Sequence, residues 1–294
     1  LLLETDVAFP ETYFAVERLG ATAVPLNLAL STDRLGAQAE RAALDALVCD
    51  SATADRAGDI VSDGTPVAPV DGEPDPPSRE PVEPARRPLD ADRLVLFTSG
   101  TTGRPKGVRL TGRNLVASAV GSAFRLGVDP ADRWLVCLPA YHMGGLAPFV
   151  RSTLYGTTAV VQRGFDAERT ADAVEAFDVT GVSLVPTMLA RLLDAGWTPP
   201  ESLRFVLLGG APADEALVER AVDRGAPVYP TYGLTETASQ VATALPPEAV
   251  EYPGTVGRPL RNAEVTIRAP GGEDRLDTGE TGEILVDGPT VTPG

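Results

Sequence analysis

Short apolar runs alternate with amphipathic stretches along residues 94–229, and this alternation constrains the fold more than any other feature of the chain. We expect strands at 93–98, 133–139, 157–162, 179–186, 203–209 and 226–231. We expect helices at 112–127, 166–177, 187–196 and 213–225. Strands that alternate with helices predict an α/β fold in which mostly parallel sheets are flanked by helices.

The segments on either side of this region differ in character. Before it we expect a helix over 11–20 that stops at Gly20, a strand at 21–26, a helix from the cap Ser31 to about Ala43, and a strand at 46–49. Residues 50–92 are acidic and proline-rich, which is typical of a surface loop. Residues 251–294 indicate short strands and turns. We therefore predict α/β subdomains over 1–250 and the start of a small, barrel-like β subdomain over 251–294.

Composition excludes several classes of partner. With 41 acidic and 25 basic residues the formal charge is −16, which repels nucleic acid. No run of about 18 apolar residues is present, so we expect no membrane span. Cys49 and Cys137 lie in apolar runs and predict buried, reduced thiols in a cytoplasmic protein. His142 is the only histidine, which makes a zinc site unexpected. A homo-oligomer is left open.

The 25 basic residues are 24 arginines and one lysine, Lys106. An acidic, lysine-poor surface is expected of a protein in a salt-rich cytoplasm, and a GC-rich genome would give the same bias through arginine codons. Both explanations stay open at this stage. In either case, a single lysine that persists against the bias points to a functional role.

That lysine lies in a glycine-rich segment, "LFTSGTTGRPKGV". The segment follows an expected strand and precedes a helix that Thr111 caps. Glycines allow positive φ and close approach of an anion, while hydroxyls, backbone N–H groups and one ammonium can bind phosphate oxygens. We expect a triphosphate site made of Thr98, Ser99, Gly100, Thr101, Thr102, Gly103 and Lys106. Arg104 and Pro105 separate the second glycine from the lysine, so the segment is not a Walker A loop.

The same segment resembles the phosphate-loop signature of the adenylate-forming enzymes, the superfamily of acyl-CoA synthetases, luciferases and peptide-synthetase adenylation domains. In that family the loop holds the β- and γ-phosphates of ATP. The resemblance extends over essentially all 294 residues, through "YPTYGLTETASQ" to "TGEILVDGPTVTPG".

Further motifs fit this resemblance. It implies that Tyr232 stacks on adenine beside Gly233, that Thr235 binds ATP, and that Glu236 coordinates Mg²⁺. The strand-to-helix segment "LLGGAPAD" implies that Gly209, Gly210 and Ala211 approach the adenine ring. Lys106, Thr235 and Glu236 are then the expected catalytic residues.

The acyl substrate is expected near "LPAYHMGGL", where the family places a histidine at the acyl pocket. The expected substrate residues are His142, Thr187, Ser239 and Gln240. "TETASQ" and "GTVGRPL" most resemble the 2-succinylbenzoate–CoA ligases of menaquinone synthesis. The alternatives are a ligase for medium- or long-chain fatty acids or another aromatic acid, an adenylation domain that loads a carrier protein, and a nucleotide binder without turnover.

The resemblance also implies a reaction in two steps. An acid attacks ATP to form an acyl-adenylate and pyrophosphate, and the thiol of coenzyme A then displaces AMP. In the family, the ribose-binding aspartate and a C-terminal lid domain with a second lysine follow the motif at which this sequence stops. We therefore expect a fragment that binds ATP and is inactive alone.

Overall fold

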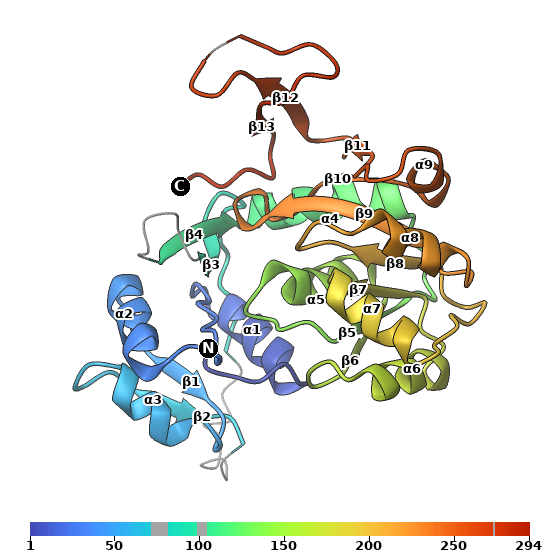
Figure 1. Ribbon diagram of the computed structural model, residues 1–294. Helices are drawn as coiled ribbons and strands as arrows, with labels where there is room; N and C mark the ends of the chain where they lie inside the picture. The colour runs from blue at the N-terminus through green and yellow to red at the C-terminus, as the bar shows by residue number, and fades with distance from the viewer. Residues whose placement is uncertain (72–81, 99–104, 273) are drawn as a thin grey trace.

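The computed structural model describes residues 1–71, 82–98, 105–272 and 274–294 (Figure 1). The largest sheet in this part of the chain has seven strands in the order β11-β10-β9-β8-β7-β5-β6. Its strands are β5 (Arg133–Val136), β6 (Thr158–Val161), β7 (Gly181–Leu184), β8 (Phe205–Leu208), β9 (Val228–Leu234), β10 (Ser239–Thr243) and β11 (Arg258–Pro259). The five from β5 to β9 are parallel, while β10 and β11 are antiparallel additions at one edge. The mostly parallel sheet is thus confirmed.

Helices cover both faces of this sheet, as the alternation predicts. The flanking helices are α4 (Gly112–Leu126), α5 (Met143–Tyr155), α6 (Ala167–Ala176), α7 (Pro186–Asp194) and α8 (Glu215–Val222). In β5, Leu135 packs in the core with α6, α7 and α8, whereas the next residue, Val136, packs in the core with α4 and α5. Because the central strands β5, β7 and β8 are buried on both faces, they appear in the sequence as apolar runs rather than alternating ones.

Helix α5 is missing from the sequence-based prediction. Gly144, Gly145 and Pro148 all disfavour a helix interior, and Pro148 lies inside α5. Nine of the thirteen residues of α5 are nevertheless buried. Tertiary packing against β5, β6 and α4 therefore outweighs the low intrinsic helix propensity.

The N-terminal region contains a smaller layer. It comprises α1 (Ala8–Arg18), α2 (Thr32–Ala42), β1 (Leu47–Cys49), α3 (Ala54–Ile60) and β2 (Val67–Pro69). The strand expected at 21–26 is reduced to an isolated bridge between Ala23 and Leu94, because Pro25 has no N–H to extend the ladder. The loop expected over 50–92 needs correction, since α3 and β2 lie within it, and β1 pairs with β2. Residues 82–91 have no helix or strand.

A hairpin connects this layer to the large sheet. Strands β3 (Asp92–Thr98) and β4 (Lys106–Thr111) pair antiparallel, with Thr98 opposite Lys106, so the two ends of the glycine-rich segment are neighbours. Thr111 caps α4 as expected. Its hydroxyl accepts the N–H of Asn114, and the Asn114 side chain accepts the Thr111 N–H.

The chain ends in short elements that extend from the sheet (Figure 1). They are α9 (Pro246–Glu251), β12 (Glu264–Arg268) and β13 (Glu283–Asp287), while the short 3-10 helix η1 (Thr235–Thr237) lies in the turn between β9 and β10. The antiparallel pairing of β12 with β13 agrees with the strands expected there. The domain boundary at residue 250 remains a prediction.

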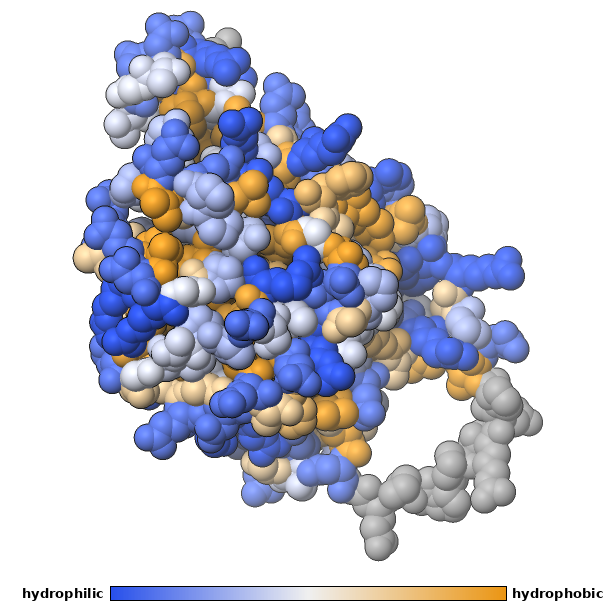
Figure 2. Space-filling model, turned by 90° about the vertical axis from the view of Figure 1, so that its right-hand side faces the viewer, coloured by the Kyte–Doolittle hydropathy of each residue, from blue (hydrophilic) through white to orange (hydrophobic). Residues whose placement is uncertain are grey.

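Hydrophilic residues spread over much of the face in Figure 2, with hydrophobic residues in scattered areas between them. Within the described ranges, no helix has both the length and the apolar character needed to cross a lipid bilayer.

Candidate functional site

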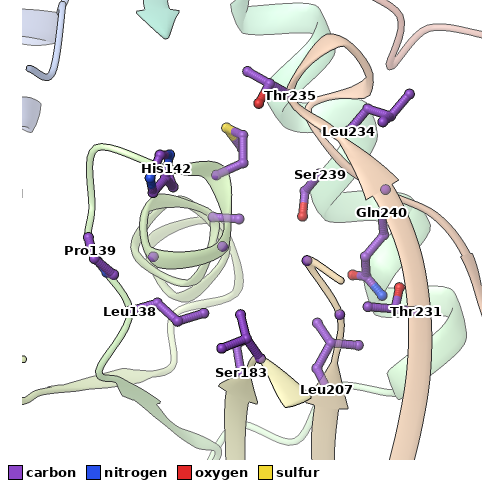
Figure 3. A pocket seen from close by; sticks show the side chains of 18 of the residues that line it. Leu138, Pro139, His142, Ser183, Leu207, Thr231, Leu234, Thr235, Ser239 and Gln240 are labelled. Carbon is purple, nitrogen blue, oxygen red and sulfur yellow. The ribbon is translucent and has the colours of Figure 1, made fainter. Parts of the chain in front are cut away.

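A cavity of about 520 Å³ opens at the carboxyl ends of β7, β8 and β9. Ligand sites of parallel α/β sheets commonly lie at this edge. The first half of α5 and the preceding residues Leu138 and Pro139 form one wall, and the segment 231–240 forms the wall opposite (Figure 3). His142 lies on the first wall and Ser239 on the wall opposite.

The cavity brings together many of the residues that the sequence indicated. Those that line it are Thr98, His142, Gly209, Gly210, Gly233, Thr235, Glu236, Ser239 and Gln240. They come from β3, the N-cap of α5, the end of β8, and the hairpin formed by β9, η1 and β10. The end of the glycine-rich segment and the acidic residue expected to bind metal therefore share one cleft.

A second cavity of about 400 Å³ adjoins the first and shares Gly210, Thr231, Gly233 and Leu234 with it. Tyr232 lines this second cavity, together with the segment 210–213 and Thr255. Ala211 and Tyr232, both expected near adenine, thus lie together, one compartment away from His142.

Other expected residues lie elsewhere. Thr187 is exposed in the first turn of α7 and does not line the cavity, so the geometry gives no support to its expected contact with substrate. Lys106 is exposed on β4, opposite the cavity residue Thr98. Ser99, Gly100, Thr101, Thr102 and Gly103 lie outside the described residues.

The turn from Thr235 to Ser239 has an unusual backbone. Ala238 has φ 53° and Ser239 has φ 113°, a region that non-glycine residues seldom occupy. The buried Thr237 hydroxyl accepts the Leu234 N–H at 3.2 Å and closes the turn. Gly233 is required where the strands approach, because a Cβ there would overlap the carbonyl oxygen of Ser239.

Arg151 is a cavity residue that the sequence reasoning missed. It lies on α5, is only 2% exposed and lines the cavity. Its guanidinium stacks over the Trp134 ring at 5.4 Å, and its buried Nε and Nη2 atoms have no hydrogen-bond partner among the described residues. Desolvation lowers the pKa of Arg151 to about 10, so the group is still cationic at neutral pH. The signal in the sequence was an arginine inside the apolar stretch "GLAPFVRSTLY".

Two other ionisable groups near the cavity are neutral. His142 lies at the cavity rim beside Tyr141, with ring centroids 4.8 Å apart, and partial burial lowers its pKa. Cys137 is buried behind the cavity, and desolvation raises the pKa of its thiol to about 12. Both cysteines are buried and free, as expected. Cys137 is therefore unsuited to act as a nucleophile.

Comparison with known proteins gives one consistent family. The family model described as "AMP-binding enzyme" matches residues 1–294. A 2-succinylbenzoate–CoA ligase of Bacillus subtilis is 37% identical over 291 residues, which cover 99% of this chain and 59% of the relative. The chain thus spans about three fifths of that relative's length.

Solved structures agree with this relationship. The o-succinylbenzoate CoA synthetase of Bacillus subtilis in complex with the acyl-adenylate intermediate OSB-AMP superposes with a TM-score of 0.92 at 37% identity, over 99% of this chain and 59% of that one. Its complex with ATP and magnesium gives a TM-score of 0.89 at 36% identity, over 100% and 61%. A long-chain-fatty-acid–CoA ligase from Archaeoglobus fulgidus gives 0.90 at 26% identity, over 99% and 63%. Backbone similarity alone therefore does not distinguish a ligase for o-succinylbenzoate from a ligase for long-chain fatty acids.

Proposed function

We propose that this chain, which belongs to the AMP-binding enzyme family, forms the nucleotide- and acyl-binding part of an ATP-dependent acid–CoA ligase that acts on 2-succinylbenzoate. The ligase would form an acyl-adenylate and then transfer the acyl group to coenzyme A. The relatives named above support this assignment. The two adjoining cavities support it independently, because an acyl-adenylate needs one compartment for the base and another for the acyl group.

In this proposal the nucleotide lies across both cavities. Adenine would lie in the smaller one, against Tyr232, Gly210 and Ala211, while Gly209 lines the larger cavity. The phosphates would lie between Thr98 and Thr235, near the end of the hairpin that carries Lys106. Lys106 is exposed, and its ammonium would neutralise charge on the leaving pyrophosphate.

The residues at 235–236 fit magnesium. Glu236 lines the cavity with an exposed carboxylate, and it forms no ion pair within the described residues. Carboxylate and hydroxyl oxygens are ligands that Mg²⁺ prefers, and phosphate oxygens usually complete its coordination. Glu236 and Thr235 would hold the ion, which would supply charge neutralisation at the phosphates.

The acid needs no general base, because a carboxylic acid is already ionised at neutral pH. What the chain must supply is placement of the carboxylate next to the α-phosphorus in a site from which water is displaced. The apolar walls of the cavity, Leu138, Met143 and Leu207, would hold the aromatic ring. Ser239 would lie in the cavity at the boundary between the acyl group and the phosphates.

Arg151 is the observation that supports a dicarboxylate. A buried guanidinium with two unpartnered nitrogens is costly unless an anion satisfies it. The second carboxylate of 2-succinylbenzoate would supply that anion, whereas the methylenes of a fatty acid would leave the charge unpaired. Glu236 is the only acidic residue among the described residues of the cavity wall, which disfavours an amino acid substrate whose ammonium needs a carboxylate.

The test uses the complete gene product and acid-dependent ATP–pyrophosphate exchange. Arg151→Met should raise the KM for 2-succinylbenzoate about 30-fold or more, because it removes a buried charge pair. The KM for decanoate, if decanoate is used at all, should not rise. Arg191→Met controls for the loss of an arginine that stacks on an aromatic ring, since the exposed Arg191 lies over Phe165 at 5.4 Å but outside the cavity.

Two outcomes would refute the assignment of 2-succinylbenzoate as the substrate. One is a KM for 2-succinylbenzoate that Arg151→Met leaves unchanged. The other is exchange in the unaltered protein that fatty acids support and 2-succinylbenzoate does not.

We also infer a cytoplasmic setting, which the two free, buried thiols support, since reducing compartments keep cysteines unpaired. Whether the protein forms a homo-oligomer stays a prediction.

A further inference from the structure

We infer that Ser118 and Asn114 of α4 are positioning residues. They would hold the Thr235–Ser239 turn in the conformation that places Glu236 for magnesium and Ser239 for the acyl group. This inference rests on the proposed function, which assigns magnesium to Glu236 and the acyl group to the side of Ser239. Neither α4 residue lines the cavity.

The first contact is a buried hydrogen bond from α4 to the turn. Ser118 is 3% exposed, and its hydroxyl donates to the carbonyl oxygen of Ala238 at 2.6 Å. Ala238 is fully buried. The bond therefore fixes the orientation of the peptide that joins Ala238 to Ser239.

That peptide joins two residues with positive φ, 53° and 113°, and neither is glycine. Such a backbone is disfavoured and persists only where surrounding contacts hold it. Without the Ser118 hydroxyl, the Ala238 carbonyl would lose a buried donor, and the turn could relax. Glu236 precedes this peptide by two residues and Ser239 belongs to it, so a relaxed turn would displace both side chains together.

The second contact comes from Asn114, one helical turn before Ser118 and therefore on the same face of α4. Its Nδ2 donates to the carbonyl oxygens of Pro289 and Val291, both at 2.9 Å. The next residue, Thr292, donates its N–H to the carbonyl oxygen of Glu236 at 2.8 Å. Asn114 thus holds the segment that contacts the metal-binding end of the turn.

Helix α4 also follows β4 directly, and β4 begins with Lys106. The Thr292 hydroxyl donates to the carbonyl oxygen of Arg109 on β4. The face of α4 that carries Asn114 and Ser118 therefore links the lysine strand to the Glu236 turn, the two elements between which the triphosphate would lie.

The test compares Ser118→Ala with Ser122→Ala in the complete gene product. Ser122 is equally buried on α4, and its hydroxyl makes no hydrogen bond to the described residues 235–239. Ser118→Ala should raise the Mg²⁺ concentration for half-maximal ATP–pyrophosphate exchange, and the KM for the acid, each about three- to tenfold. Ser122→Ala should change neither, and its thermal stability should stay the same or rise, because the buried Ser122 hydroxyl has no hydrogen-bond partner among the described residues to lose.

Hydrogen exchange of the backbone amides 234–240, followed by mass spectrometry, gives a readout that does not need activity. Exchange should be faster in Ser118→Ala than in Ser122→Ala. Asn114→Asp keeps the oxygen that accepts the Thr111 N–H and removes the donor to Pro289 and Val291, so it should shift the Mg²⁺ requirement in the same direction.

The two proposals fail in different ways. An unaltered protein without acid-dependent exchange would refute the ligase, and the amide exchange would still decide the role of Ser118. Amide exchange and Mg²⁺ requirement that are the same in Ser118→Ala and Ser122→Ala would overturn the positioning role, whatever the reaction is.

Discussion

At the level of single residues, burial lowers the pKa values of two cavity groups with different consequences. The pKa of Arg151 falls to about 10, and the side chain remains a cation at neutral pH. The pKa of His142 falls below its ordinary 6.5, and the imidazole is therefore neutral. One end of the cavity is thus positive, while the rim presents a neutral ring that does not compete with Arg151 for an anion.

The lowered pKa of His142 predicts a pH-dependent loss of stability. Below pH 6.5 the unfolded chain binds a proton at His142 while the folded chain does not yet, so stability falls with falling pH. His142→Gln removes this contribution. The free energy of unfolding, measured in urea at several pH values, should therefore fall less steeply below pH 6.5 in the variant. A parallel decline in both proteins would contradict the assignment.

The sequence identified the residues of this site that belong to local motifs and missed the one that depends on packing. Thr235, Glu236, Ser239 and His142 lie in short segments whose composition already indicates their chemistry. Arg151 is separated from them, and its position over Trp134 depends on how α5 packs on β5. Nothing local to Arg151 shows that its nitrogens lack partners.

At the level of elements, the sequence predicted the segments with a clear apolar pattern and missed those whose local residues gave no such signal. Strands β5 to β9 and helices α4, α6, α7 and α8 all lie where alternation places them. Strand β10 was missed because the turn before it, at Ala238 and Ser239, contains neither glycine nor proline. Helix α5 was missed because its glycines and proline indicate a loop, and only burial explains the helix.

The two adjacent glycines of α5, Gly144 and Gly145, differ in the space available for a Cβ. Replacing each with alanine therefore gives a matched pair of variants. A Cβ at Gly145 would overlap the carbonyl oxygens of Leu138 and Pro139, which are backbone atoms and cannot move aside. A Cβ at Gly144 would meet only the Leu138 side chain, at 3.2 Å. Gly145→Ala should therefore lower the free energy of unfolding by about 1–3 kcal/mol.

Gly144→Ala should be close to neutral or slightly stabilising, because alanine has the higher helix propensity. Urea unfolding of both variants provides the measurement. Equal effects would mean that the close approach of α5 to residues 138–139 does not determine the stability of this wall.

For the whole molecule, the excess of negative charge is the main long-range contribution to the folding free energy that we consider. The formal charge of −16 produces self-repulsion that destabilises the compact state. Ion pairs such as Arg113 with Asp90 and Arg169 with Asp166 have partners that are largely exposed, and exposed pairs contribute little. Repulsion should therefore outweigh attraction in the electrostatic part of the folding free energy.

This balance predicts that salt stabilises the protein. Raising NaCl from about 0.05 M to about 1 M shortens the Debye length from more than 10 Å to about 3 Å and screens the repulsion, so the Tm in scanning calorimetry should rise. Glu40, Glu175 and Glu219 are exposed and form no ion pair in the described parts of the chain. Replacing all three with glutamine removes three negative charges without removing an attraction, so the Tm of this variant should rise less with salt. A Tm that falls with NaCl, or the same slope in both proteins, would contradict the conclusion that charge repulsion dominates the electrostatic part of the folding free energy.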